Sequence, residues 1–140
     1  MVEPKRSASN MFEARTNDIH VSVETRFLEN ESEPDNQYFV WAYHIRITNH
    51  GTETVQLLSR HWIITDGMGR VQEVKGEGVV GEQPVLGPGG SYAYPSGTPL
   101  STPTGMMRGS YLMQSRSGDR FEIEIPMFSL DSDHAKKILH

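Results

Sequence analysis

Residues 39–48 read FVWAYHIRIT, and this stretch decides the fold class of the chain. Large aromatic and branched apolar side chains occupy the odd positions, and smaller or polar side chains occupy the even ones. A period of two is typical of a β-strand that buries one face against a core. The stretch therefore predicts a strand whose odd-numbered side chains, Trp41 among them, lie in the core.

The segments on either side carry the same kind of signal. Residues 19–27 alternate in the same way, and polar turns separate further extended segments at 55–58, 61–65, 71–75, 106–113 and 121–125. Seven or eight short strands without a helical repeat indicate an antiparallel sandwich or barrel, and a sandwich fits better. A Trp in the middle of the core strand is typical of immunoglobulin-like domains. The prediction is an all-β, immunoglobulin-like antiparallel β-sandwich.

The length of 140 residues suits one domain. We expect a flexible N-terminal arm at 1–13, the sandwich at 14–130, and a C-terminal tail at 131–140 for which both a short helix and a frayed end fit the sequence. The N-terminus lacks the apolar segment of a signal peptide, and no apolar run reaches the ~20 residues of a membrane span. The absence of cysteine fits a reducing compartment, so the predicted location is cytoplasmic.

Charge and motif content narrow the function. The net charge is −5 and no basic cluster exceeds Lys136-Lys137, which argues against a nucleic-acid partner. The chain has no G-x-S-x-G motif. Glu122 and Glu124 share the outward face of a predicted strand, where solvated charges are the ordinary explanation. We therefore name no catalytic residue, expect no cofactor, and favour a protein that is not an enzyme.

The stretch Gly76–Gly81 reads GEGVVG and matches the letters of the dinucleotide fingerprint G-x-G-x-x-G. In a Rossmann unit these glycines open a helix whose N-terminus holds the pyrophosphate. Here Gln83-Pro84 follows at once, so no helix can begin. Eight of the 13 glycines and five of the eight prolines lie between Gly76 and Gly105. We expect turns and bulges, and a region that is mostly loop with a short strand at Tyr92 and Tyr94.

A second interpretation of the glycines stays open. A backbone nest can bind an anion without a helix. Such a site for phosphate or a nucleotide would use Lys75, Gly76, Gly78 and Gly81, with Lys75 or Arg70 as the counter-charge.

The six histidines raise the question of a metal site. None of them lies in H-x-H or H-E-x-x-H, the local patterns that ligate zinc. His44 and His61 would converge if their strands paired, and Glu24 or Asp66 would then join them. The alternative is surface histidines with ordinary hydrogen bonds.

A long ordered set of residues between 61 and 128 carries a resemblance to a known family. The set comprises His61-Trp62, Asp66-Gly67, the string 76–84, the string 86–89, Tyr92, Ser96-Gly97, Leu100, Thr102-Pro103, 105–107, 109–111 and the closing strand 121–128 with Ile125-Pro126. It is similar to the signature of the ApaG family, and the similarity covers about residues 15–130. An ordered string of this length is far more specific than a lone G-x-G-x-x-G.

The resemblance implies a fibronectin-type-III-like β-sandwich and a small bacterial protein. It also implies a genetic link to cobalt resistance and magnesium efflux, and a gene neighbour that encodes a diadenosine tetraphosphatase. Related domains occur in eukaryotic proteins, where a protein-binding role is supposed. The family brings no agreed activity and no established catalytic residues.

These observations favour a non-enzymatic module that binds an unidentified protein partner. Loops held on a rigid sheet scaffold are common recognition sites. The predicted contact residues are Tyr92, Tyr94, Pro95, Leu100 and Met106. Exposed sheet edges can add a partner strand, and because the candidate edges hold few prolines we also expect a homo-oligomer. The alternatives are a protein that binds a phosphate-containing small molecule at the glycine loop, and a divalent-metal-responsive protein.

Overall fold

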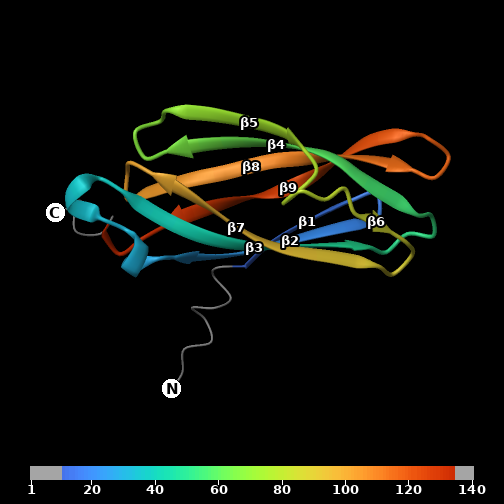
Figure 1. The fold of residues 1–140 in the computed structure, drawn as a ribbon, viewed down its shortest axis with the longest axis horizontal. Helices are drawn as coiled ribbons and strands as arrows, with labels where there is room; N and C mark the ends of the chain where they lie inside the picture. Colours follow the sequence, from blue (N-terminus) through green and yellow to red (C-terminus); the bar gives the residue numbers. More distant parts are fainter. Residues whose placement is uncertain (1–10, 135–140) are drawn as a thin grey trace, which may run out of the picture.

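The alternating segments form the strands of two stacked sheets in the computed structural model, which describes residues 11–134 (Figure 1). Their bounds are β1 Met11–Thr16, β2 Ile19–Phe27, β3 Phe39–Asn49, β4 Val55–Asp66, β5 Val71–Glu77, β6 Val85–Leu86, β7 Ser91–Leu100, β8 Thr104–Ser115 and β9 Arg120–Asp131. Two 3₁₀ turns, Glu29–Glu31 and Pro34–Asn36, connect β2 to β3. Within these described residues, no helix has the length and apolar character needed to cross a membrane.

All strand pairs are antiparallel, as the sequence predicts. The first sheet has the order β1-β2-β3-β7. The second has the order β5-β4-β8-β9, and β6 adds a short pairing to β4. The two sheets enclose one hydrophobic core, so the predicted β-sandwich is confirmed.

The core strand behaves as its alternation predicts. The odd-numbered side chains of β3 from Phe39 to Ile47 are all buried. Trp41 is 1% exposed, and its indole Nε1–H donates to the carbonyl oxygen of Asp131 at 2.8 Å. Because the donor and the acceptor come from opposite sheets, this hydrogen bond ties the layers together while it satisfies a buried polar group.

The sandwich is closed along one side and open along the other. On the closed side β1 lies beside β9, and the backbone N–H of Glu124 donates to Oγ1 of Thr16 at 3.2 Å. On the open side β5 pairs only with β4, and β7 pairs only with β3, within the part of the chain that the structure describes. The space between the sheets is therefore accessible between β5 and β7.

The expectation of a mostly loop region from 76 to 105 is wrong, because the short strand predicted at Tyr92 and Tyr94 extends over Ser91–Leu100 as the ten-residue edge strand β7. The backbone N–H of Asn49 donates to the carbonyl oxygen of Gly90, so even-numbered residues of this segment direct their backbone groups toward β3. Pro95 and Pro99 are odd-numbered. Their missing N–H groups therefore fall on the free edge, where proline costs no ladder hydrogen bond.

Three boundaries differ from the sequence-based expectation. β1 begins at Met11, so residues 11–13 belong to the first sheet and only 1–10 of the expected arm lie outside the described residues. Segments 55–58 and 61–65 are one strand, β4, with a register shift between Leu57 and Ser59. Asp131 ends β9, while 135–140 of the expected tail lie outside the described residues.

Candidate functional site

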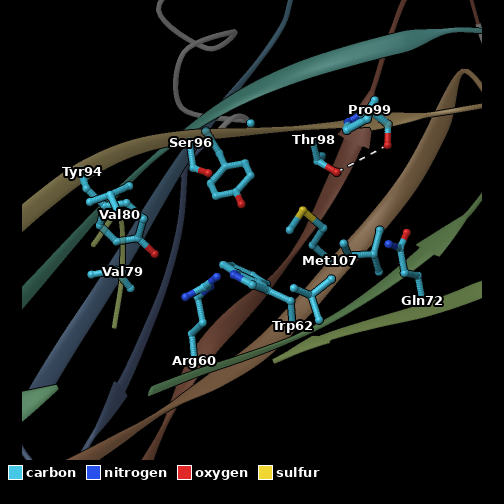
Figure 2. A pocket seen from close by; sticks show the side chains of 14 residues that line it. Arg60, Trp62, Gln72, Val79, Val80, Tyr94, Ser96, Thr98, Pro99 and Met107 are labelled. Carbon is cyan, nitrogen blue, oxygen red and sulfur yellow. Dashed lines mark hydrogen bonds between the residues drawn. The ribbon is translucent and has the colours of Figure 1, made fainter. Parts of the chain in front are cut away.

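A cleft of about 390 Å³ opens between the sheets along the β5–β7 side (Figure 2). β3 and β7 line one wall, β4, β5 and β8 line the other, and the turn after β5 closes one end. Its lining includes Tyr43, Tyr94, Ser96 and Thr98 from the first sheet and Arg60, Trp62, Val74 and Met107 from the second. The rings of Tyr43 and Trp62 meet edge to face across the cleft, with centroids 5.6 Å apart.

The register shift in β4 places Arg60 in this cleft. Side chains alternate along a strand, and Leu57 faces the core before the shift. After the shift Trp62 and Ile64 face the core, so the inward positions change from odd to even. Arg60 shares the inward parity of Trp62. Re-aiming a side chain in this way is a common role of a β-bulge.

Gly76 gives the guanidinium of Arg60 the room it needs. Arg60 lies opposite Gly76 in the β4–β5 ladder, and a Cβ on Gly76 would come within 2.7–2.8 Å of three guanidinium atoms. Nη1 of Arg60 then donates to the carbonyl oxygens of Glu77 at 3.1 Å and Gly78 at 2.8 Å. The guanidinium is thus fixed across the end of β5, beside the cleft.

Buried phenol groups face this cation. The hydroxyl oxygens of Tyr94 and Tyr111 are 2.6 Å apart. Burial raises the pKa of Tyr43, Tyr94 and Tyr111 above the ordinary value of 10.0, and the positive charge of Arg60 opposes the increase in all three. The three phenols therefore stay protonated at neutral pH and can donate hydrogen bonds.

Among residues 11–134, Arg60 is the only charged residue that lines the cleft. None of the ion pairs within residues 11–134 involves Arg60. The guanidinium has further N–H donors besides those of Nη1, and it lies next to phenol hydroxyls and aromatic walls. Such a site suits a carboxylate or a phosphate that carries an apolar group.

The sequence similarities agree with this architecture. Residues 29–115 match the family profile of the ApaG domain. Protein ApaG of Parvibaculum lavamentivorans is 55% identical over 130 residues, which cover 93% of this chain and 100% of that protein. The chain belongs to the ApaG family.

Two further comparisons place this ApaG-family chain among its relatives. Protein ApaG of Paramagnetospirillum magneticum is 58% identical over 130 residues, again 93% of this chain and 100% of that protein. A crystal structure from Bordetella pertussis, of a protein that carries the name ApaA, has 51% sequence identity and a TM-score of 0.81. The superposition covers 83% of this chain and 94% of that one.

The glycine string of this ApaG-family protein forms a closed turn. The N–H of Gly78 donates to the carbonyl oxygen of Leu58, and Val79 and Glu82 exchange two backbone hydrogen bonds of 2.8 and 2.9 Å. Gly78, Val80 and Gly81 have positive φ, and the turn buries the side chain of Val79 completely. Two of the N–H groups that a nest would aim at an anion are therefore already used.

The structure separates the residues of the predicted anion site. Gly76 and Gly78 contact Arg60, which the sequence analysis did not single out. Lys75 lies opposite His61 on the outer face of the second sheet, away from the cleft. The nearest cation to the glycines inside the cleft is Arg60.

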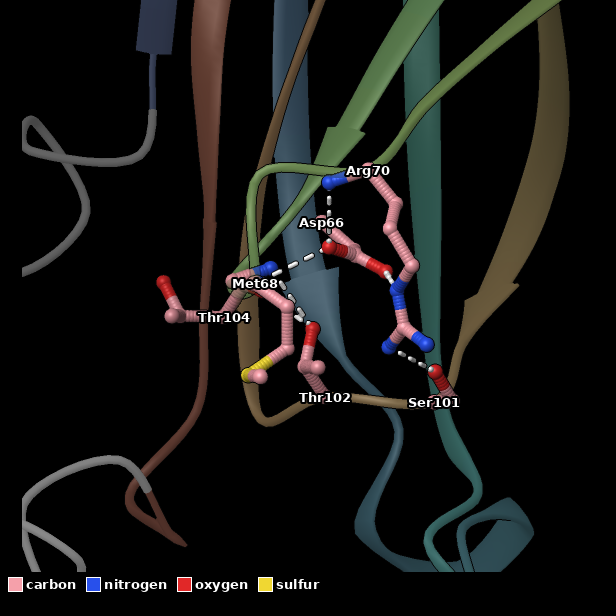
Figure 3. Close-up of polar contacts among 7 residues, drawn as sticks. Asp66, Met68, Arg70, Ser101, Thr102 and Thr104 are labelled. Atoms are coloured by element: carbon pink, nitrogen blue, oxygen red, sulfur yellow. Dashed lines mark hydrogen bonds and ion pairs between the residues drawn. The ribbon is translucent and has the colours of Figure 1, made fainter.

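Arg70, the other predicted counter-charge, lies in the β4–β5 turn at the opposite end of β5, where its side chain donates hydrogen bonds (Figure 3). Its Nε donates to Asp66 at 2.7 Å and its Nη2 donates to Ser101 at 3.1 Å. The backbone N–H of Gly67 donates to Oγ1 of Thr102 at 2.8 Å. These contacts join the β4–β5 turn to the β7–β8 turn and so connect the two sheets.

The predicted partner surface does not form one patch. Tyr94 is 4% exposed and belongs to the core, and Tyr92 and Leu100 pack partly against it. Pro95 is exposed on the outer face of the first sheet. Met106 is 44% exposed and shares the outward parity of β8 in the second sheet. The five residues therefore point in different directions.

His44 and His61 do not converge, because β3 and β4 do not pair and belong to different sheets. His44 lies opposite Glu24 on the outer face of the first sheet. His61 lies on the outer face of the second sheet, where its Nε2 is 3.3 Å from Oε2 of Glu73. Among the described residues, no three His, Asp or Glu side chains are grouped so that they could hold a metal ion.

The contact between Arg60 and Gly76 predicts an energetic coupling. Gly76→Ala forces the guanidinium off the carbonyls of Glu77 and Gly78, whereas in an Arg60→Ala background the added methyl group meets no guanidinium. We expect a coupling free energy of about 1–2 kcal/mol between the two substitutions. Urea denaturation of the wild type, both single variants and the double variant measures it. Additive effects, within about 0.5 kcal/mol, would show that the contact is absent.

The buried phenols predict a loss of stability in alkali. Their folded-state pKa values lie above the unfolded value of 10.0. Their contribution to the free energy of unfolding is therefore complete below about pH 10 and declines as the pH rises above it. Each phenol that stays protonated only in the folded state lowers the unfolding free energy by about 1.4 kcal/mol per pH unit. Tyr94→Phe should remove one such contribution and flatten the slope between pH 10 and 11. An unchanged slope in urea denaturation at these pH values would contradict the assignment.

Proposed function

We propose that this ApaG-family protein is a non-enzymatic binding module that acts by protein–protein interaction through the cleft between β5 and β7. The observation that supports this proposal is Arg60, a cation without a carboxylate partner among the described residues, set into a wall of apolar and aromatic side chains. Rigid strands carry these residues, so the site is formed before any partner arrives. Binding then costs little conformational entropy.

The chemistry of the cleft selects an acidic segment as its occupant. One carboxylate would pair with the guanidinium of Arg60 and accept a hydrogen bond from the hydroxyl of Tyr43 or Tyr94, while a neighbouring apolar side chain would pack on Trp62 and Met107. The volume of about 390 Å³ suits a few side chains of a peptide segment and is too small for a folded domain. The proposed partner is therefore a protein that presents an Asp, a Glu or its C-terminal carboxylate beside an apolar residue.

A selection experiment tests this proposal. A random peptide library displayed on phage is selected against the immobilised protein, and the affinities of the selected peptides are compared with Arg60→Gln. We expect enrichment of Asp and Glu, and an affinity loss of about tenfold or more, because hydrogen bonds to charged groups contribute about 1.5–3 kcal/mol. Arg46→Gln is the matched control, since Arg46 is exposed on the outer face of the first sheet.

Two outcomes would contradict the proposal. Peptides that bind Arg60→Gln as tightly as the wild type would show that the cleft is not the site. Selected peptides without an acidic group would show that the guanidinium does not determine the choice of ligand.

A phosphate-containing small molecule is the second candidate ligand. A guanidinium binds phosphate as well as carboxylate, and here it lies beside the glycine turn whose sequence suggested a nucleotide. Pyrophosphate and ATP are therefore included as competitors of the selected peptides. Competition that Arg60→Gln abolishes would favour this candidate.

The remaining functional expectations stay predictions. We attach the association with cobalt resistance and magnesium efflux to the unidentified partner, since the geometry supports binding of an acidic group. A response to divalent metals and a cytoplasmic location likewise rest on the sequence and on the family resemblance.

A further inference from the structure

The free edge of β5 differs from the other three sheet edges. β1 and β9 lie side by side and close one flank of the sandwich. β7 carries Pro95 and Pro99 on its free edge, and prolines there block the addition of another strand. β5 contains no proline and pairs only with β4 among the described residues. An edge of this kind is a template for an additional strand.

The backbone hydrogen bonds to β4 define which residues of β5 direct their N–H and C=O groups toward the free edge. Arg70 accepts from the N–H of Asp66 at 3.0 Å, and Gly78 donates to Leu58 at 2.9 Å, so even-numbered residues are bonded to β4. The N–H and C=O groups that face the free edge are those of the odd-numbered residues. These residues are Val71, Glu73, Lys75 and Glu77.

We propose that β5 pairs in antiparallel fashion with β5 of a second copy of this chain, about a two-fold axis at Val74. This register places Glu73 of each copy opposite Lys75 of the other, so two oppositely charged pairs form on the outer face. The same register pairs Val71 with Glu77, and all four outward-facing residues join the ladder as hydrogen-bonded pairs.

The neighbouring registers are electrostatically unfavourable. The pattern of the ladder allows the axis to move only in steps that keep odd residues opposite odd residues. An axis at Glu73 would place Glu73 opposite its own copy, and an axis at Lys75 would do the same for Lys75. Like charges directly opposite each other destabilise a sheet. The charges of β5 therefore disfavour both neighbouring registers. An axis at Gly76 would also pair Lys75 with Glu77, but it would leave Val71 and Glu73 without partners in β5.

Exposed apolar side chains near both ends of β5 support the same arrangement. Met68 and Val71 are 74% and 64% exposed at the beginning of the strand, and Val80 is 56% exposed in the turn that follows it. An antiparallel two-fold brings the beginning of one strand next to the end of the other. Met68 and Val71 of one copy then approach Val80 of the second copy, which removes apolar surface from water.

The pairing has a consequence for the cleft. The two-fold axis of an antiparallel strand pair is perpendicular to the sheet, so the first sheets of both copies lie on the same side of the joined second sheets. The two clefts then face each other across the axis as one groove with two Arg60 side chains. The pairing itself does not depend on what the cleft binds.

Charge reversal at the two central positions tests the proposal by sedimentation velocity. The wild type should form a dimer in a concentration-dependent manner. Lys75→Glu leaves only glutamates at positions 73 and 75, and Glu73→Lys leaves only lysines there. Each variant alone should dimerise at least about tenfold more weakly than the wild type. A mixture of the two variants should regain the dimer, because every pair is then oppositely charged.

A charge-matched variant outside β5 is the control. Glu53→Lys changes the net charge as Glu73→Lys does, but lies in the exposed β3–β4 turn, and it should dimerise like the wild type. Far-UV circular dichroism melts confirm that each variant is folded. A wild type that is monomeric at its solubility limit would overturn the proposal. A dimer that both reversals leave unchanged, or a mixture that stays monomeric, would overturn it as well.

Discussion

The register shift in β4 is the constraint on which the candidate site depends. Before the shift Leu57 points into the core, and after it Arg60 and Trp62 do. If the alternation continued past Leu57 without a register shift, His61 would point inward and the guanidinium would lie on the solvated outer face. A single bulge therefore brings a cation between the sheets, where water screens it less than at the surface.

Two other features make the guanidinium of Arg60 available to a ligand in the cleft. Gly76 leaves open the volume that the guanidinium occupies, and the carbonyls of the glycine turn fix its orientation. Closure of the sandwich along β1 and β9 leaves β5 and β7 apart, so the guanidinium is accessible from the β5–β7 side. The glycines that resemble a nucleotide fingerprint thus position the side chain of Arg60. The backbone N–H groups of Gly78 and Val79 already donate to the carbonyl oxygens of Leu58 and Glu82.

The sequence predicts the fold well wherever alternation is continuous, as in β3. It underestimates the length of β7, because Gly97 and two prolines indicate loop after Tyr94 although an edge strand tolerates them. Arg60 had a detectable signal: the inward positions change from odd at Leu57 to even at Trp62. The positions of His44 and His61 had none, because alternation identifies strands and their faces but not the sheet to which each strand belongs.

A titration with benzoate, an apolar carboxylate, tests most directly whether the cleft binds anionic groups. During the titration, the side-chain Nε–H resonance of Arg60 is followed by NMR. If the cleft binds anionic groups, this resonance and that of the indole N–H of Trp62 should shift together and reach saturation. The Nε–H resonance of Arg46, on the outer face, should stay unchanged. A linear response, or no shift of the Arg60 resonance up to the solubility limit of benzoate, would show that the cleft does not bind anionic groups.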